Sequence, residues 1–544
     1  MPSRKISPRK RKENHLPINL LLISIIIFAC VILNKVSSKL GIPMLLAFIL
    51  LGMFFGSDGV VKIPFENYQF AEQICSVALI FIMFYGGFGT NWNEAKPVAK
   101  KSIMLSTLGV IMTAGLTGLF CHFVLKIDIL ESLLIGSVIS STDAASVFSI
   151  LRSKNLGLKD NTASMLEIES GSNDPCSYML TAIFIAAIRG ANTAGSMAYM
   201  IFAQIAYGII FGGVIAALSV IFIRKYRFTT EGFSEIFVVG VAILSYALPA
   251  AIGGNGYLSA YIVGIILGNT HIKNKKKLVI FFDGITGLMQ MAIFFLLGLL
   301  SFPSKLPGVA FEAMLIALFI TFIARPATIF VLLGKNNSMN QKLLVSWSGL
   351  RGAASIVFAI MAKMSINTTL DIFHVVFFIV LFSILIQGSL IPFMARKLNM
   401  IDEDADVMKT FNDYVSKPIG FIRFTIPEGH KWCGKELKEL WIPPDMLFVL
   451  IKRGGENILP DGDTVLMAGD SVIACAAQFE DRDGITLTEI EVTKDSHYNG
   501  TTIADLPDGN SGLIIMIQRK DEIIIPNGDV RLQKGDILVT NQGL

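Results

Sequence analysis

Residues 167–175 read Glu-Ile-Glu-Ser-Gly-Ser-Asn-Asp-Pro and lie in a stretch of the chain that is otherwise apolar. Carboxylates, hydroxyls and an amide therefore fall where a membrane-spanning helix is expected. Ionisable side chains cost several kcal/mol each in hydrocarbon, so within a membrane they face a cavity or a partner and usually serve a function. The segment indicates a polar site inside a membrane, and it makes the chain a candidate transporter.

The spacing within this segment suits a monovalent cation. Ser170 and Asp174 are four residues apart and share one face of a helix. Pro175 has no N–H with which to bond the carbonyl of Gly171, so we expect a free carbonyl oxygen one turn before Asp174. A carboxylate, a hydroxyl and a carbonyl replace the water oxygens around a hard cation. The sequence thus predicts cation binding at Asp174 and a break in the helix at Pro175.

Two further segments place polar groups in apolar surroundings. Residues 140–145 read Ser-Ser-Thr-Asp-Ala-Ala, and Ser, Thr and Asp side chains compete for backbone hydrogen bonds and weaken a helix. An unwound segment that lines a cavity is common in secondary transporters. Residues 348–355 read Ser-Gly-Leu-Arg-Gly-Ala-Ala-Ser, whose small side chains permit close contact between helices. Arg351 needs a buried partner there, and we expect a carboxylate of the 167–175 segment.

The elements that must position these residues are membrane helices. The chain has 544 residues, of which 53% are hydrophobic and 16% charged, whereas soluble proteins have about 25% charged residues. Apolar runs close to the ~20 residues that cross a bilayer recur from residue 16 to residue 398. We expect a polytopic α-helical protein of the cell membrane with about thirteen spans. These are 16–34, 41–57, 72–90, 102–124, 129–150, 161–188, 199–223, 234–250, 256–270, 281–300, 309–333, 343–362 and 371–395.

Lys and Arg gather in alternate loops. The loops after odd-numbered spans carry most of them, and the loops after even-numbered spans carry only Lys62, Lys126, Arg189, Lys305 and Lys363. Positively charged loops stay in the cytoplasm, so the odd loops and the C-terminal tail are predicted to be cytoplasmic. The basic N-terminal arm disagrees, because an odd number of spans places it outside the cell. Either its charges are overridden or the span count is off by one.

The tail after residue 400 is a repeat. Arg453 and Arg519 lie 66 residues apart, as do Asp470 and Asp536. Each copy has short β-branched runs, a Pro-X-Gly-Asp turn and a later Gly-Asp pair, a pattern that predicts strands. We expect two small, β-rich α+β modules packed as a pseudo-dimer in the cytoplasm. The expected divisions are a basic arm, a membrane domain, an acidic linker and two modules, at 1–15, 16–398, 399–417, 418–480 and 481–544.

The tail resembles the C-terminal half of the RCK family, the regulators of potassium conductance, over about residues 418–544. The dinucleotide-binding half of that family, with its GxGxxG loop, is not found in the sequence, so control by NAD or ATP through that half is not expected. Some members bind small effectors, including cyclic di-AMP, between paired modules. Two roles stay open for this tail: a sensor of such a nucleotide, and a plain assembly or stability domain.

The three polar segments occur in order on spans five, six and twelve. Together they resemble the cation:proton antiporter-1 family of NhaP and sodium/proton-exchanger proteins, over about residues 16–398. The resemblance implies inverted repeats with broken crossing helices, a homodimer, and exchange of a cation for a proton. Asp174 would be the exchanging carboxylate, and Asn173 would orient it. The other implied roles are the cation shell, with Thr142, Asp143 and Ser170, and a structural ion pair, with Glu169 and Arg351.

Two features depart from relatives in that family. Relatives often carry an acidic residue before the two glycines of the third span, where this chain has Phe84-Tyr85-Gly86-Gly87. The network around Arg351 is therefore simpler or uses Glu167. Electrogenic relatives have two aspartates at the site and a lysine in the tenth span. Here Asn173 precedes Asp174 and residues 281–300 contain no lysine, which resembles the electroneutral branch.

Several single residues keep two interpretations. Asp143, and less readily Asp174, either binds the cation or caps a broken helix. Glu167 is either a proton acceptor behind the site or a residue at its water-filled entrance. Arg325 is interpreted as a snorkelling or helix-pairing residue and not as a ligand.

The sequence therefore predicts a secondary transporter, not an enzyme, that exchanges K⁺ or Na⁺ for H⁺. K⁺ is favoured because RCK-type modules accompany potassium handling. No cofactor is expected, apart from a regulatory nucleotide at the tail, and the six histidines show no metal-ligand spacing. Membrane lipid is an expected partner and nucleic acid is not, since the basic residues sit in loops and in the arm. The alternative is an RCK-regulated potassium channel or an uncoupled potassium-transport subunit, although the sequence has no TVGYG-like filter.

Overall fold

The structure is a computed structural model in which the chain divides into two compact units, Met1–Tyr414 and Val415–Leu544, called here the membrane unit and the tail unit. The described residues are 16–40, 43–154, 156–190, 193–226, 232–270, 272, 275–334, 337–402, 419–440, 442, 446–477, 487–493, 496, 498–506, 513–519, 522–524, 526 and 528–541. The predicted basic N-terminal arm and most of the predicted acidic linker lie outside them.

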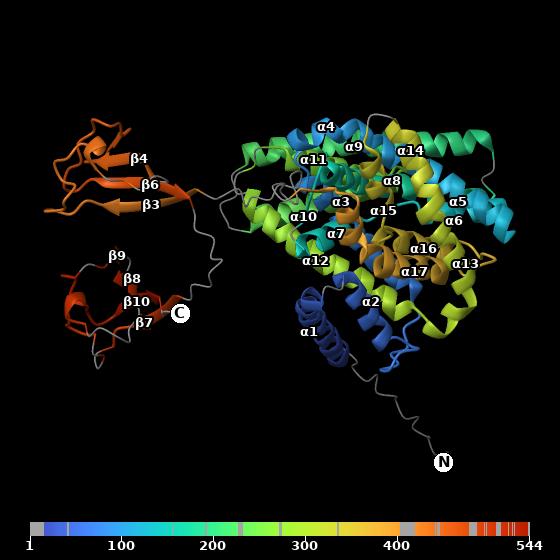
Figure 1. Ribbon diagram of the computed structural model, residues 1–544, viewed down its shortest axis with the longest axis horizontal. Coiled ribbons are helices and arrows are strands. Elements are labelled where there is room, and N and C mark those ends of the chain that lie inside the picture. Colours follow the sequence, from blue (N-terminus) through green and yellow to red (C-terminus); the bar gives the residue numbers. More distant parts are fainter. Residues whose placement is uncertain are drawn as a thin grey trace, which may run out of the picture. The chain divides into compact units, whose positions relative to one another are not determined.

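The membrane unit is a bundle of helices (Figure 1). Its first half has α1 (Leu16–Leu40), α2 (Met44–Phe55), α3 (Tyr68–Gly89), α4 (Trp92–Met104), α5 (Val110–Leu125), α6 (Ile129–Val138), α7 (Ala144–Ser153) and α8 (Thr162–Ile188). Its second half has α9 (Ala194–Lys225), α10 (Phe233–Ala251), α11 (Gly256–Gly268), α12 (Lys275–Leu300), α13 (Leu306–Phe319), α14 (Arg325–Leu333), α15 (Met339–Trp347), α16 (Ala353–Ser365), α17 (Ile372–Phe382) and α18 (Ile391–Lys397). Two short strands, β1 (Gly157–Leu158) and β2 (Ile401–Asp402), pair antiparallel.

The helices confirm a polytopic membrane fold. Among the described residues, six helical segments are long and apolar enough to cross a bilayer, or seven if the bent pair Ile372–Gly388 and Ile391–Lys397 counts as one span. Shorter apolar helices, such as α6 and α16, fall below the length of a full span. They are halves of helices that are broken inside the bundle. The number of about thirteen spans stays a prediction.

Two broken helices cross near the middle of the membrane unit. Residues 139–143 separate α6 from α7, so the predicted unwound segment is confirmed. Residues 348–352 separate α15 from α16, and the sequence did not predict this second break. The two breaks are hydrogen-bonded to each other, because the Asp143 N–H donates to the Leu350 carbonyl with an N···O distance of 2.8 Å.

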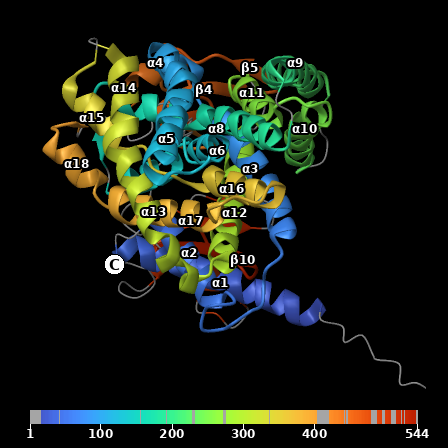
Figure 2. The same cartoon turned by 90° about the vertical axis from the view of Figure 1, so that its right-hand side faces the viewer.

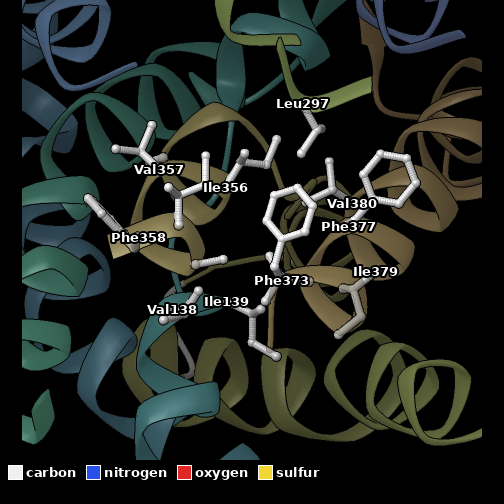
Figure 3. Packing of buried hydrophobic residues seen from close by; sticks show 14 of the residues in the cluster. Val138, Ile139, Leu297, Ile356, Val357, Phe358, Phe373, Phe377, Ile379 and Val380 are labelled. Atoms are coloured by element: carbon white, nitrogen blue, oxygen red, sulfur yellow. The ribbon is translucent and has the colours of Figure 1, made fainter. Parts of the chain in front are cut away.

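The broken helices run in opposite directions. Residues of α6 and α16 belong to one apolar cluster, and residues of α7 and α15 belong to another. One helix therefore passes from the first cluster to the second, and the other returns, which is the inverted arrangement that was expected. In the first cluster, side chains from the end of α6, from α16 and from α17 gather around Phe373 (Figure 3).

Helix α8 passes the crossing without a break. It runs from Thr162 to Ile188 and includes Pro175, and it packs on α4 and α6 (Figure 2). The prediction of a helix break at Pro175 is therefore wrong. Membrane helices tolerate proline, and here the helix continues on both sides of it. The Asn255 side-chain amide donates to the Pro175 carbonyl at 2.7 Å, which ties the start of α11 to α8.

Helices α3 and α11 approach each other backbone to backbone. A Cβ at Gly87 would collide with the Tyr261 carbonyl, and a Cβ at Gly264 would collide with the Phe84 carbonyl. Small residues at such contacts let membrane helices pack closely. Gly87 of α3 and Gly264 of α11 thus serve packing, and their contact fixes the end of α3 that carries Tyr85. A Cβ at Gly86 would meet no atom within 4 Å.

The tail unit contains two four-stranded antiparallel sheets with equivalent strand orders, β3-β6-β4-β5 and β7-β10-β8-β9. The first has β3 (Ile419–Thr425), β4 (Met446–Arg453), β5 (Glu456–Ile458) and β6 (Ser471–Ala477). The second has β7 (Leu487–Glu491), β8 (Leu513–Arg519), β9 (Glu522–Ile524) and β10 (Asp536–Asn541). The helical part of each described module is a single 3₁₀ turn, at Leu437–Glu439 and Ile503–Asp505.

Equivalent residues of the two modules make the same ion pair. Arg453 contacts Asp470 at 2.7 Å, and Arg519 contacts Asp536 at 2.8 Å, with both carboxylates buried. The guanidinium hydrogen bonds hold the pKa of each carboxyl below its usual range. The predicted tandem repeat is confirmed down to the level of these contacts.

Candidate functional site

A cavity of about 430 Å³ lies beside the crossing of the two broken helices. It is bounded by the unwound segment after α6, by α8, by the start of α16, and by α3 and α12. Its polar lining residues are Tyr85, Ser141, Thr142, Asp143, Glu167, Ser170, Asp174, Asp283, Thr286 and Gln290. Four carboxylates in one cavity are suited to attracting and binding a cation.

Asp174 sits where α8 meets the unwound segment. It lines the cavity, is 7% exposed, and accepts a hydrogen bond from the Ser141 hydroxyl. Ser141 was part of the motif that predicted the unwound segment, but it was not assigned to the site. Its position directly before Thr142 in that motif was the available signal.

Ser170 and Asn173 tie α8 to the unwound segment at one residue, Thr142. The Asn173 amide donates to the Thr142 hydroxyl at 2.6 Å, and the Ser170 hydroxyl donates to the Thr142 carbonyl at 2.7 Å. Thr142 and Ser170 line the cavity with Asp174, while Asn173 is 1% exposed. The structure thus brings these four predicted site residues together. Asn173 lies where it can position the others.

Asp143 has a capping role in the structure. Its carboxylate accepts from the Ser146 backbone N–H at 3.3 Å and from the Ser146 hydroxyl at 2.5 Å, which caps the start of α7. Asp143 also lines the cavity, so the cap leaves it beside the other oxygen atoms. Gly352 makes room for it, because a Cβ at that position would collide with the Asp143 side chain.

Arg351 compensates the partial negative charge at the C-terminus of α6, the first half of a broken helix. Its guanidinium Nη1 donates to the carbonyls of Ser140 and Ser141, at 2.9 and 2.8 Å. These carbonyls follow the C-terminus of α6, where a helix carries partial negative charge. Arg351 is 2% exposed. It therefore supports the unwound backbone that carries Ser141, Thr142 and Asp143.

The arginine that pairs with Glu169 is Arg325. Their nearest atoms, Nη1 and Oε1, are 2.5 Å apart, and both side chains are buried. The predicted ion pair of Glu169 with Arg351 is thus wrong, because the partner of Glu169 is Arg325. The physical reason is that Gly349, in the second break, leaves the space that the Arg325 side chain occupies. Arg325 joins α14 to α8, which confirms helix pairing and excludes snorkelling.

Two carboxylates line the cavity away from the crossing. Glu167 lies within the first two turns of α8 and lines the cavity, with both of its carboxylate oxygens buried. Asp283 of α12 was not predicted as a site residue, although a lone carboxylate in an apolar span was a signal. The expected span began at residue 281, whereas α12 begins at Lys275 and places Asp283 about two turns from the start of the helix. The Tyr85 hydroxyl donates to Asp283 at 3.3 Å.

Comparison with protein families matches the chain in two parts. The sodium/hydrogen exchanger, transmembrane family matches residues 24–397. The TrkA-C domain matches residues 421–478 and 487–539. The first match contains the whole crossing and its cavity, and the second matches the two repeated modules.

Individual proteins that are similar to this chain are named as antiporters. The chain is 32% identical to the K⁺/H⁺ antiporter NhaP of Alkalimonas amylolytica over 465 residues, which are 84% of this chain and 80% of that protein. It is 32% identical to the K⁺/H⁺ antiporter NhaP2 of Shewanella sp. (strain ANA-3), over 81% of this chain and 78% of that protein. The solved structure of the sodium proton antiporter MjNhaP1 from Methanocaldococcus jannaschii matches 69% of this chain and 99% of that chain, with a TM-score of 0.62 and 23% identity. That last likeness concerns the fold.

Proposed function

Because this chain belongs to the sodium/hydrogen exchanger family, and so is a monovalent cation/proton antiporter of the cell membrane, we propose that it exchanges K⁺ for H⁺ at Asp174. The observation that carries the proposal is the position of Asp174, buried at the crossing and open to the cavity. K⁺ is proposed because the similar full-length antiporters from Alkalimonas and Shewanella are named for K⁺. The family match decides against the alternative of a potassium channel.

Exchange follows from competition for one carboxylate. A carboxylate must be deprotonated before it binds a cation, so a proton and a cation exclude each other at Asp174. Asp143, Thr142 and Ser170 supply the further oxygen atoms of the proposed cation shell. The half-helices α7 and α16 also begin at the crossing, but their partial positive charge is offset there by the Asp143 cap. A cation is thus held by carboxylate, hydroxyl and carbonyl oxygens without a full hydration shell.

Transport requires that the loaded site changes the side to which it opens. The unwound segment is hydrogen-bonded both to α8 and to the second break, so we expect these three elements to move together. We place the motion between these elements and the helices that face them across the cavity, α3 and α12. Only the protonated and the cation-loaded forms cross, since an empty charged carboxylate is costly in the membrane.

We propose one proton per cation. Asn173 supplies an amide where electrogenic relatives have a second carboxylate, and its side chain is committed to Thr142. The residues of α12 that line the cavity are Asp283, Thr286, Gly287, Gln290 and Phe294. None of these described residues is a lysine that would pair with the site. Exchange with this stoichiometry generates no membrane potential.

The experiment is antiport by everted membrane vesicles, with proton movement followed after addition of K⁺ or Na⁺ at several pH values. We expect saturable, cation-driven proton movement that Asp174→Asn abolishes. Glu312→Gln is the matched control, because Glu312 of α13 is not among the described residues that line the cavity. Full activity of Asp174→Asn would overturn the assignment of the exchanging carboxylate. A clear preference for Na⁺ would overturn the assignment of K⁺.

For the tail we propose regulation by a small anionic effector, with cyclic di-AMP as the first candidate, and for the whole protein a homodimer. The match to two TrkA-C modules supports a regulatory tail. The same vesicles test the effector: cyclic di-AMP should change the antiport rate of the full chain and leave a chain ending after residue 414 unaffected. Equal rates with and without the nucleotide in the full chain would exclude this ligand. Mass measurement of the purified protein in detergent tests the dimer.

A further inference from the structure

Helix α12 presents a polar stripe to the cavity. Asp283, Thr286, Gly287 and Gln290 all line it, and their spacing of three, four and seven residues from Asp283 places them on one face of the helix. The stripe lines the same cavity as Asp174 but from another helix, and the exchange mechanism proposed at Asp174 does not use it. After its three N-terminal lysines, helix α12 is otherwise largely apolar and packs on α2 and α3.

Thr286 is the unusual member of this stripe. It is only 8% exposed, and its hydroxyl lacks a hydrogen-bond partner among the described residues. A buried hydroxyl without a partner costs about 1–3 kcal/mol, so such a group normally serves a ligand or an ordered water molecule. Thr286 lines the cavity and its oxygen exposes less than 1 Å², so the partner it requires is a ligand or a water molecule that binds against α12.

Asp283 supplies the charge beside this hydroxyl. It lies one helical turn before Thr286, about 4.5 Å along the helix axis, and it is exposed to the cavity. The Tyr85 hydroxyl donates to one of its carboxylate oxygens at 3.3 Å, which holds the side chain at the wall. A carboxylate oxygen and a hydroxyl oxygen one turn apart form the beginning of a coordination shell for a hard cation.

This pair lies toward the mouth of the cavity. Asp283 is eight residues from the start of α12, which is marked by Lys275, Lys276 and Lys277. Glu167, on the same cavity, lies five residues from the start of α8. The distribution of Lys and Arg assigns both helix starts to the cytoplasm. A cation that enters from the cytoplasm therefore passes this level before it reaches the crossing.

We propose that Asp283 and Thr286 form a second subsite for a monovalent cation, on the α12 side of the cavity that Asp174 also lines. The proposal rests on the exchange function proposed above and adds an intermediate stop to it. The subsite takes an incoming K⁺ or Na⁺ that has lost part of its water shell and passes it to the site at the crossing. It raises the affinity for the cation, and it does not carry the proton.

The test separates affinity from maximum rate. In everted vesicles with increasing K⁺, Asp283→Asn should raise the half-saturating K⁺ concentration about tenfold, equivalent to about 1.4 kcal/mol of lost binding. Its rate at saturating K⁺ should stay near that of the parent. Thr286→Val, which keeps the shape and removes the oxygen, should raise the half-saturating concentration in the same direction by a smaller factor. Asp283→Glu keeps the charge and should recover part of the affinity.

Two controls make the outcomes distinct. Glu312→Gln should leave the half-saturating concentration unchanged, and Asp174→Asn reports on the exchange site itself. If Asp174→Asn is inactive but Asp283→Asn and Thr286→Val keep the parent half-saturating concentration, the second subsite is overturned and the exchange site stands. If Asp174→Asn retains activity, the proposed function falls. A purely structural role of Asp283 would lower the maximum rate and the protein yield of Asp283→Asn, with Thr286→Val unchanged, and that result also overturns the subsite.

Discussion

Two buried arginines near the site bind different partners. Arg325 neutralises a carboxylate, Glu169, whereas Arg351 binds the carbonyls of Ser140 and Ser141. The sequence placed both arginines inside spans, and either was able to reach the carboxylates of α8. Which of them does so depends on the path of the backbone at Gly349, and spacing along the chain does not contain that information.

The Glu169–Arg325 pair leads to a stability prediction. Glu169→Gln leaves the Arg325 charge buried and uncompensated, and removal of one partner of a buried ion pair costs about 3–5 kcal/mol. We expect a clearly lower thermal unfolding midpoint of the purified protein in detergent and a lower yield from membranes. The double variant Glu169→Gln with Arg325→Met removes both charges and should regain much of the loss.

The comparison variant is Arg351→Met, which leaves Glu169 paired. Arg351→Met leaves two carbonyls at the crossing without their donor, but it leaves no buried carboxylate uncompensated. Adding Glu169→Gln to Arg351→Met should therefore not raise the unfolding midpoint. If the double variant of Glu169 and Arg325 is as unstable as Glu169→Gln alone, the ion pair does not account for the stability.

At the scale of elements, the sequence predicted the break between α6 and α7 but not the break between α15 and α16. Residues 140–143 carry side chains that compete for the backbone, so their unwinding was predictable. In residues 348–352 the signal was weaker, because Gly349 and Gly352 were interpreted as contact residues only. Pro175 gave the opposite error, since α8 continues through it and membrane helices tolerate proline. Local propensity thus failed where the surroundings of a segment, and not its own residues, decided whether the helix continued.

The second break yields a prediction of its own. Gly352 has φ −140° and ψ −151°, an extended conformation that any residue adopts, so the need for glycine there is steric. A Cβ would meet the Asp143 side chain, and overpacking of this kind costs about 1–3 kcal/mol. Gly352→Ala should therefore displace the cap of α7 and strongly reduce cation-driven proton movement in vesicles.

Gly284→Ala is the matched control, because a Cβ at Gly284 meets no atom within 4 Å. Alanine is a better helix former than glycine by about 1 kcal/mol, so this variant should keep both activity and thermal stability. Equal activity of the two alanine variants would mean that the contact between Gly352 and Asp143 is unimportant for exchange.

At the scale of the whole molecule, the exchange site belongs entirely to the membrane unit. All residues proposed to bind the cation precede residue 300, and the repeated modules form a compact unit of their own. The tail was predictable because its repeat is visible in the sequence at a constant offset. The end of the membrane unit was harder to predict, since the apolar runs stop at residue 398 while strand β2 of this unit extends to Asp402.

The last prediction concerns that boundary. Met400 is 3% exposed within the apolar cluster of α7 and α15, its carbonyl accepts from the Lys159 N–H at 2.9 Å, and Ile401–Asp402 pairs with Gly157–Leu158. A chain that ends after residue 398 loses these contacts, and removal of a buried methionine side chain alone costs about 2–5 kcal/mol. A chain that ends after residue 414 keeps them.

We expect the longer truncated chain to retain most of the antiport activity of the full chain in vesicles. The shorter one should show a lower unfolding midpoint and little activity, because β1 directly precedes α8 and its loss loosens the helix that carries Asp174. Equal stability of the two truncated chains would show that β2 is dispensable and that the membrane unit ends with α18.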